Sequence, residues 1–135
     1  MAKIPLIAIV DDDEEVREAL CELLIVAGFT SHTFDSAVTF LAGRGICDFD
    51  CIVTDIHMPA MSGLELIARL HAEGANPPIV VLSSIRDDQV RRQALALGIC
   101  TWLSKPVRDE RLLEAIETAI IATDRPNGNP SDGIR

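Results

Sequence analysis

The chain has 135 residues and a formal net charge of −9, and 48% of its residues are apolar. This length is enough for one domain with a hydrophobic core. The acidic balance argues against sequence-independent binding of nucleic acid, which needs clustered Lys and Arg. No apolar run reaches the roughly 20 residues of a membrane span. The first apolar run, Ile4–Val10, ends in three aspartates without a cleavage site, which indicates a strand and not a signal peptide. We therefore expect a cytoplasmic protein that does not enter a membrane.

Compact apolar runs alternate along the chain with segments of helical periodicity. The compact runs are short and mostly rich in branched residues, as is typical of buried strands. The predicted strands are Leu6–Val10, Thr30–Phe34, Cys51–Thr54, Ile79–Leu82 and Thr101–Leu103. The predicted helices are Glu14–Ala27, a short helix from the N-cap Ser36 to about Leu41, Leu64–Ala72, a helix capped by Asp87 or Asp88 that runs to Leu97, and Asp109–Ala122.

This alternation of five strands and five helices predicts an α/β, (βα)5 doubly wound fold. Right-handed crossovers then give a five-stranded parallel sheet with helices on both faces. We assign residues 1–123 to one domain. Residues 124–135 are rich in Pro, Gly, Asn and Asp, and we expect a disordered tail or the stub of a linker there.

The cysteines show no spacing typical of a zinc site. We expect reduced and partly buried thiols, as in a cytosolic protein. The cysteines are Cys21, Cys47, Cys51 and Cys100.

Polar side chains follow the predicted strands at the point where each strand ends. In an open parallel sheet these carboxyl ends line the ligand-binding crevice. If the strand order is 2-1-3-4-5, three carboxylates, a hydroxyl and an amine from the ends of four strands would converge in one crevice. The polar residues at the strand ends are Asp11, Asp12 and Asp13 after the first strand, Asp55 after the third, Ser83 and Ser84 at the fourth, and Lys105 after the fifth.

This set of groups matches the requirements of phosphoryl transfer. Crowded carboxylates repel one another, so they need a cation or a proton, and hard oxygen ligands suit Mg²⁺. A carboxylate such as Asp55 can attack phosphorus to form an aspartyl phosphate. Lys105 would neutralise the charge of the transferred group, and Ser83 can donate a hydrogen bond to it.

Each signal also has a plainer interpretation. Asp11 and Asp12 could cap the first helix, although Asp13 fits that position better. Ser83 and Ser84 compete for the hydroxyl role, and the strand register favours Ser83. Taken alone, Lys105 is typical of a surface lysine.

Several motifs in combination resemble one known family. The matching stretches are Ile9-Val10-Asp11-Asp12, Val53-Thr54-Asp55, Met58-Pro59-Ala60-Met61-Ser62-Gly63, Val81-Leu82-Ser83-Ser84 and Lys105-Pro106. Over about residues 4–122 the sequence resembles the receiver domain of two-component response regulators, which has a flavodoxin-like fold. The loop after Asp55 is most similar to the FixJ-like subgroup.

The resemblance implies a role for each matching residue. Asp55 corresponds to the phosphoacceptor, which also contacts the metal. Asp11 and Asp12 correspond to the acidic pair that holds Mg²⁺, together with the backbone carbonyl of His57. Lys105 corresponds to the lysine that contacts the phosphoryl group, and the peptide bond before Pro106 would be cis.

The resemblance also implies a switch and its partners. Ser83 corresponds to the hydroxyl residue that moves toward the phosphoryl group. Trp102 stands where Tyr or Phe is usual, at the aromatic position that then swings inward. The phosphoryl donor would be a sensor histidine kinase or a phosphotransfer protein, and a homodimer could form on phosphorylation.

Two alternative functions remain at this point. A haloacid dehalogenase-type phosphatase also uses Mg²⁺ and an aspartyl nucleophile, but it has a second Asp two residues later, where this chain has His57. A receiver-like binding module that is never phosphorylated is the other. On the favoured interpretation the chain is not an enzyme beyond its own phosphorylation and slow autodephosphorylation. It would be a stand-alone receiver or the receiver part of a transcriptional regulator, without direct nucleic acid binding by this segment.

Overall fold

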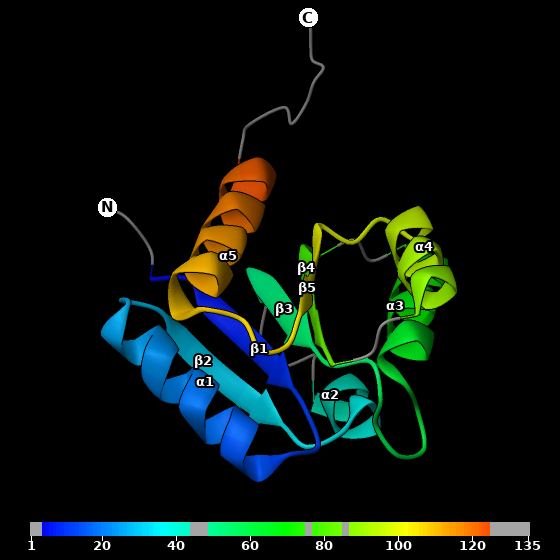
Figure 1. The fold of residues 1–135 in the computed structure, drawn as a ribbon, viewed down its shortest axis with the longest axis horizontal. Helices are drawn as coiled ribbons and strands as arrows, with labels where there is room; N and C mark the ends of the chain where they lie inside the picture. Colours follow the sequence, from blue (N-terminus) through cyan, green and yellow to red (C-terminus); the bar gives the residue numbers. More distant parts are fainter. Residues whose placement is uncertain (1–3, 44–48, 75–76, 85–86, 125–135) are drawn as a thin grey trace, which may run out of the picture.

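The computed structural model describes residues 4–43, 49–74, 77–84 and 87–124, which contain five strands and five helices in alternation (Figure 1). The strands are β1 (Leu6–Val10), β2 (Thr30–Phe34), β3 (Cys51–Thr54), β4 (Ile79–Ser83) and β5 (Thr101–Ser104). The helices are α1 (Glu14–Val26), α2 (Ala37–Gly43), α3 (Gly63–Ala72), α4 (Asp88–Ala96) and α5 (Asp109–Asp124). Each element lies within two residues of its predicted bounds.

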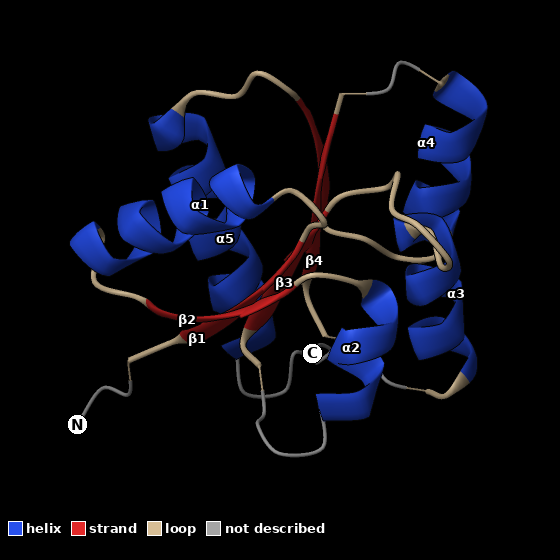
Figure 2. Ribbon diagram, turned by 90° about the horizontal axis from the view of Figure 1, so that it is seen from below, coloured by secondary structure: helices blue, strands red, loops and turns tan. Residues whose placement is uncertain are grey.

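The strands form one parallel sheet in the order β2-β1-β3-β4-β5, as predicted. Helices α1 and α5 cover one face of the sheet, and α2, α3 and α4 cover the other (Figure 2). All five carboxyl ends therefore meet at one edge of a three-layered domain.

The core consists of two apolar clusters, one on each face of the sheet. Val10 and Val81 belong to the cluster beneath α2, α3 and α4, and Ile9 and Val80 belong to the cluster beneath α1 and α5. Neighbouring strand residues thus face opposite sides, and both sides are buried. Because each buried aliphatic side chain contributes about 1.5–3 kcal/mol, the central strands form a rigid base for the residues that follow them.

Side chains and glycines define the helix ends. The Asp13 carboxylate accepts hydrogen bonds from the backbone N–H groups of Glu15 (2.9 Å) and Val16 (3.4 Å), so the capping role predicted for Asp13 is confirmed. Asp87, and not Asp88, caps α4 in the same way. Gly28 follows α1 with a φ of 95°, a left-handed conformation that glycine adopts without a steric cost.

Two predicted boundaries differ from the structure. The short helix after Ser36 was predicted to end at about Leu41 but continues to Gly43, and Asp124 was expected in the tail but ends α5. Both helices continue beyond the last residue of their predicted apolar stripe, because the hydrogen-bonded turn that ends a helix does not depend on that stripe. Residues 125–135 and Cys47 lie outside the described residues.

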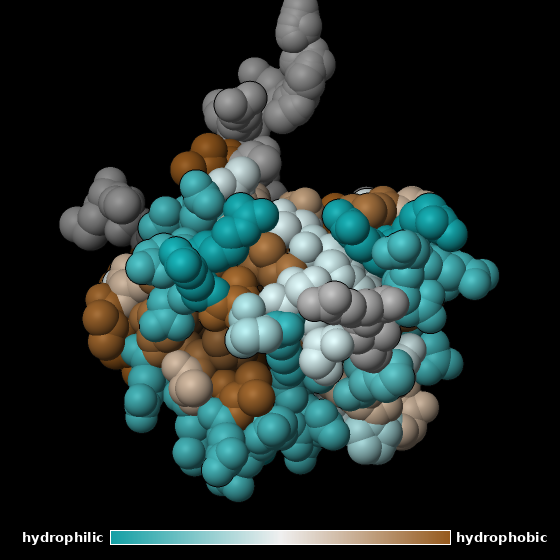
Figure 3. All heavy atoms as spheres, in the orientation of Figure 1, coloured by the Kyte–Doolittle hydropathy of each residue, from teal (hydrophilic) through white to brown (hydrophobic). Residues whose placement is uncertain are grey.

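The surface is largely hydrophilic on the face seen in Figure 3, with apolar colour gathered between α1 and α5. None of the helices in the described part of the chain combines the length and apolar character needed to span a bilayer. The three described cysteines, Cys21, Cys51 and Cys100, are free thiols.

Candidate functional site

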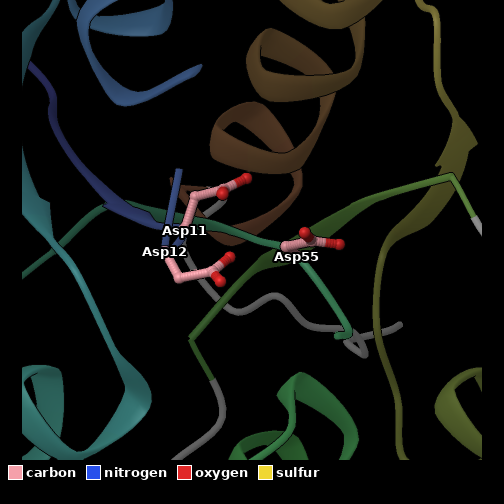
Figure 4. A group of neighbouring side chains, drawn as sticks. All are labelled: Asp11, Asp12 and Asp55. Atoms are coloured by element: carbon pink, nitrogen blue, oxygen red, sulfur yellow. The ribbon is translucent and has the colours of Figure 1, made fainter. Parts of the chain in front are cut away.

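Three carboxylates meet at the carboxyl edge of the sheet. Val10 of β1 pairs with Thr54 of β3, so the residues that follow these two strands are neighbours. One carboxylate oxygen each of Asp11, Asp12 and Asp55 lies within 4.8 Å of the other two (Figure 4). The structure thus brings Asp55 together with two adjacent aspartates that are far from it in the sequence.

Backbone hydrogen bonds hold Asp55 in place. Its N–H donates to the Val10 carbonyl (3.1 Å), and its own carbonyl accepts from the Thr54 hydroxyl (2.9 Å). One side-chain oxygen, Oδ1, accepts from the Ile56 N–H (2.7 Å), while Oδ2 lies 3.5 Å from Nζ of Lys105. The Asp55 side chain is only 13% exposed, and its carboxylate lies beside the Lys105 ammonium group.

Asp11 is the buried member of the cluster, with 3% of its surface exposed. Its Oδ1 accepts a hydrogen bond from the Asp13 N–H (2.9 Å), and its Oδ2 lies 3.4 Å from Nζ of Lys105. Burial raises the pKa of Asp11 above 3.8; the Asp13 N–H and Lys105 oppose this shift, and the Asp55 charge adds to it. A negative charge at Asp11 therefore has an energetic cost, which a further cation in the cluster would reduce.

Lys105 lies between the two carboxylates of Asp11 and Asp55. The Lys105 N–H donates to the Ser83 carbonyl (2.8 Å), which joins the end of β5 to the end of β4. The peptide bond between Lys105 and Pro106 is cis, which confirms the expectation drawn from the family resemblance. The Lys105 ammonium group lies 3.4 Å from Asp11 Oδ2 and 3.5 Å from Asp55 Oδ2, so it belongs to the cluster.

Ser83 and Trp102 lie on the same face of the sheet. Val81 pairs with Trp102, and Ser83 lies two residues beyond Val81 on β4. Ser83 is fully buried, whereas Ser84 is exposed. Trp102 is partly buried against the cluster beneath α2, α3 and α4.

His57 lies in the loop after β3 with an exposed side chain. Together with Met58, Pro59 and Ser62 it lines an open hollow of about 440 Å³. This hollow gives the loop beside Asp55 an accessible surface.

Two residues of the site were not identified from the sequence. Arg17 donates a hydrogen bond from Nη1 to the carbonyl oxygen of Asp11 (2.8 Å). Gly63 packs so closely against the backbone that follows β3 that a Cβ there would lie 2.0 Å from the Asp55 carbonyl oxygen. The position of Gly63 within a loop motif was a usable signal; for Arg17 the only signal was a basic residue one turn into the helix after the acidic triplet.

A family model described as the response regulator receiver domain matches residues 7–117. The chain belongs to the response regulator receiver domain family. Receiver domains are signalling modules of two-component systems, and the five-stranded fold described above is that of this family.

Individual proteins agree with this assignment. The chain is 38% identical over 114 residues to the transcriptional regulatory protein FixJ of Bradyrhizobium diazoefficiens, covering 84% of this chain and 56% of FixJ. It is 35% identical over 125 residues to the response regulator protein TodT of Pseudomonas putida, covering 91% of this chain and 54% of TodT.

Solved structures give the same result for the fold. Full-length FixJ from B. japonicum superposes with a TM-score of 0.84 at 35% identity, covering 91% of this chain and 61% of that one. A structure titled FixJ-N superposes with a TM-score of 0.82 at 34% identity, covering 89% of this chain and 96% of that one. This receiver domain thus spans about half the length of the curated relatives that it matches.

Proposed function

We propose that this receiver domain is a phosphorylation-dependent switch in which Asp55 accepts a phosphoryl group with the help of Mg²⁺. The observation that supports the proposal most directly is the convergence of Asp11, Asp12 and Asp55 with Lys105 at one edge of the sheet. The membership of the chain in the receiver family supports the same chemistry.

The donor set fits a magnesium ion. Carboxylate oxygens are hard ligands, and Mg²⁺ in proteins takes one or two carboxylates while it keeps water and phosphate oxygens. In the proposed site Asp12 and Asp55 would hold the ion, together with the backbone carbonyl of His57, and Asp11 would hold it largely through water. When bound, the metal would neutralise charge that develops on the transferred phosphoryl group.

The remaining chemistry belongs to side chains of this chain. The Asp55 Oδ2 attacks phosphorus, and the bond between phosphorus and its leaving group breaks, so an acyl phosphate forms. The Lys105 ammonium group, 3.5 Å from the Asp55 carboxylate, pairs with a phosphoryl oxygen. Ser83 donates its hydroxyl to another phosphoryl oxygen, and Trp102 changes its packing in response.

The proposed donor is the phosphohistidine of a sensor histidine kinase or of a phosphotransfer protein. The relatives FixJ and TodT are named as a transcriptional regulatory protein and a response regulator protein, so we propose that this segment acts alone or as the receiver part of such a regulator. The net charge of −9 disfavours direct DNA binding by this segment. The proposal also includes a homodimer formed on phosphorylation. The proposed location is the cytoplasm, where such kinases deliver their phosphoryl groups, and the proposed domain comprises residues 1–123.

The test is labelling of the purified chain by acetyl phosphate in the presence of Mg²⁺, followed by intact mass. We expect a mass gain of one phosphoryl group that hydroxylamine removes, as for an acyl phosphate. Asp55→Asn should abolish the gain, and chelation of Mg²⁺ should do the same in the unmodified chain. Full labelling of the Asp55→Asn variant would overturn the proposal.

The matched control is Asp87→Asn, which removes a carboxylate at the N-cap of α4. Asn caps a helix about as well as Asp, so this variant should fold and become labelled like the unmodified chain. Sustained turnover of p-nitrophenyl phosphate by the unmodified chain would instead favour the phosphatase alternative.

The switch is tested separately, because Trp102 is the single tryptophan of the chain. Beryllofluoride with Mg²⁺ mimics the phosphorylated state, and we expect it to shift the Trp102 emission in the unmodified chain but not in Ser83→Ala. An unchanged spectrum at a beryllofluoride concentration that blocks labelling would refute the proposed switch.

A further inference from the structure

The carbonyl of Asp11 lies beyond the last paired residue of β1. Asp11 is the first residue beyond β1, and the pairing of β1 with β2 ends at Val10 and Phe34. The Asp11 N–H still donates to the Phe34 carbonyl of β2 (3.1 Å). Its carbonyl oxygen instead accepts a hydrogen bond from Nη1 of Arg17 at 2.8 Å.

Arg17 is well placed for this contact. It lies in the second half of the first turn of α1, and its own N–H donates to the Asp13 carbonyl at 3.0 Å, so its backbone is fixed within the helix. The side chain is only partly exposed. A hydrogen bond from a charged guanidinium is stronger than one from a neutral donor, so the contact holds the carbonyl in one direction.

The peptide that Arg17 holds joins the two acidic residues of the site. The six atoms of a peptide unit are planar, so fixing the Asp11 oxygen also fixes the N–H and Cα of Asp12. The Asp11 carboxylate is buried and bonded on both oxygens, whereas Asp12 is exposed. Asp12 therefore depends on its backbone for the direction of its carboxylate.

We propose that Arg17 is a positioning residue for the metal site: through the Asp11 carbonyl it orients the Asp11–Asp12 peptide so that the Asp12 carboxylate is directed at the bound cation. This inference rests on the proposed function, because it assumes a divalent cation among the three carboxylates. Because Arg17 belongs to α1, the proposal gives this helix a part in orienting the metal ligands.

Charge and geometry predict opposite effects for the loss of Arg17. A guanidinium close to a cation site repels the cation, so the removal of its charge by itself would strengthen Mg²⁺ binding. The loss of a group that orients a metal ligand weakens metal binding, typically by about 10- to 100-fold. The sign of the change therefore separates the two roles.

The experiment measures the Mg²⁺ dissociation constant by isothermal titration calorimetry, and the rate of acetyl phosphate labelling at saturating Mg²⁺. For Arg17→Met we expect the dissociation constant to rise by about 10-fold, with a saturated rate within about 2-fold of the unmodified chain. Arg17→Lys keeps the charge but lacks the planar guanidinium, so its dissociation constant should also rise, by at least about 3-fold.

The control is Arg69→Met on α3, where Arg69 pairs with Glu73 at 3.5 Å and is 56% exposed. It removes the same charge away from the cluster and should leave the dissociation constant within about 2-fold. An unchanged or tighter dissociation constant in Arg17→Met would overturn the positioning role, and so would unchanged binding in Arg17→Lys. If the unmodified chain itself bound no Mg²⁺ or took no phosphoryl group, the proposed function would fail instead.

Discussion

Replacement of Gly63 by Ala tests whether the backbone beside Asp55 is as tightly packed as the structure indicates. A Cβ at this position would lie 2.0 Å from the Asp55 carbonyl oxygen and 3.0 Å from both the Asp55 carbonyl carbon and Cα of Ile56. Ordinary contacts need about 3.5 Å, so the backbones must separate by about 1.5 Å. All three opposing atoms belong to the backbone, so no side chain can move aside to relieve the clash.

The cost follows from what would have to move. Separation breaks the hydrogen bond from the Gly63 N–H to the Ile56 carbonyl (2.8 Å), at about 1 kcal/mol. Overpacking adds about 1–3 kcal/mol, so we expect Gly63→Ala to lower the free energy of unfolding by about 2–4 kcal/mol. Because the displaced peptide carries Asp55, the labelling rate should also fall, by about 100-fold for a shift near 1 Å.

The assays are urea unfolding followed by Trp102 fluorescence, and acetyl phosphate labelling below the unfolding transition. Gly43→Ala is the matched control: its Cβ would lie 3.5 Å from Cε1 of Phe34, an ordinary contact, and Gly43 is in a helix. It should leave stability unchanged or raise it by up to about 1 kcal/mol. A Gly63→Ala chain with the original urea midpoint and labelling rate would refute the packing argument.

Three further outcomes are expected. Ala60 has a φ of 69°, so Ala60→Gly should relieve about 1–2 kcal/mol of left-handed strain against about 0.5–1 kcal/mol of added unfolded-state entropy; a lower urea midpoint would contradict this net gain. Burial raises the pKa of Cys51 to about 12, so a maleimide at pH 8 should label the exposed Cys100 and leave Cys51 unmodified until the chain unfolds; peptide mass mapping decides, and rapid labelling of folded Cys51 would count against its burial. The pKa of Asp11 is raised in the folded state, so the folded chain binds the carboxyl proton of Asp11 more tightly than the unfolded chain does. The folded chain therefore loses stability as the pH rises from about 3.8 through the pKa of Asp11 in the folded state. In chelator, Asp11→Asn should therefore be more stable than the unmodified chain at pH 7, with the difference vanishing below about pH 3.8, and a difference of the same size at both pH values would argue against this origin.

The sequence by itself determined the elements and their order. Branched apolar runs such as Ile79–Leu82 and helical stripes such as that of Glu14–Ala27 are local patterns, and strict alternation leaves few parallel topologies. The caps were also local, since Asp13 and Asp87 bond to N–H groups within three residues of themselves. The helix ends were less well determined, because the last turns of α2 and α5 extend past the apolar pattern.

The candidate site was predictable as a set of strand ends, because any parallel sheet in this order brings Asp11, Asp55 and Lys105 to one edge. What the tertiary structure alone decided are the contacts that depend on side-chain reach and close packing. The Lys105 Nζ lies between the carboxylates of Asp11 and Asp55, at 3.4 and 3.5 Å. Arg17 contacts the carbonyl of Asp11, six residues earlier, across the connection between β1 and α1, and the sequence does not specify the path of that connection. The approach of Gly63 to the Asp55 carbonyl likewise depends on how the start of α3 packs against the backbone that follows β3. Such distances come from the packing of separate elements against one another, whereas periodicity and capping are set by neighbours along the chain.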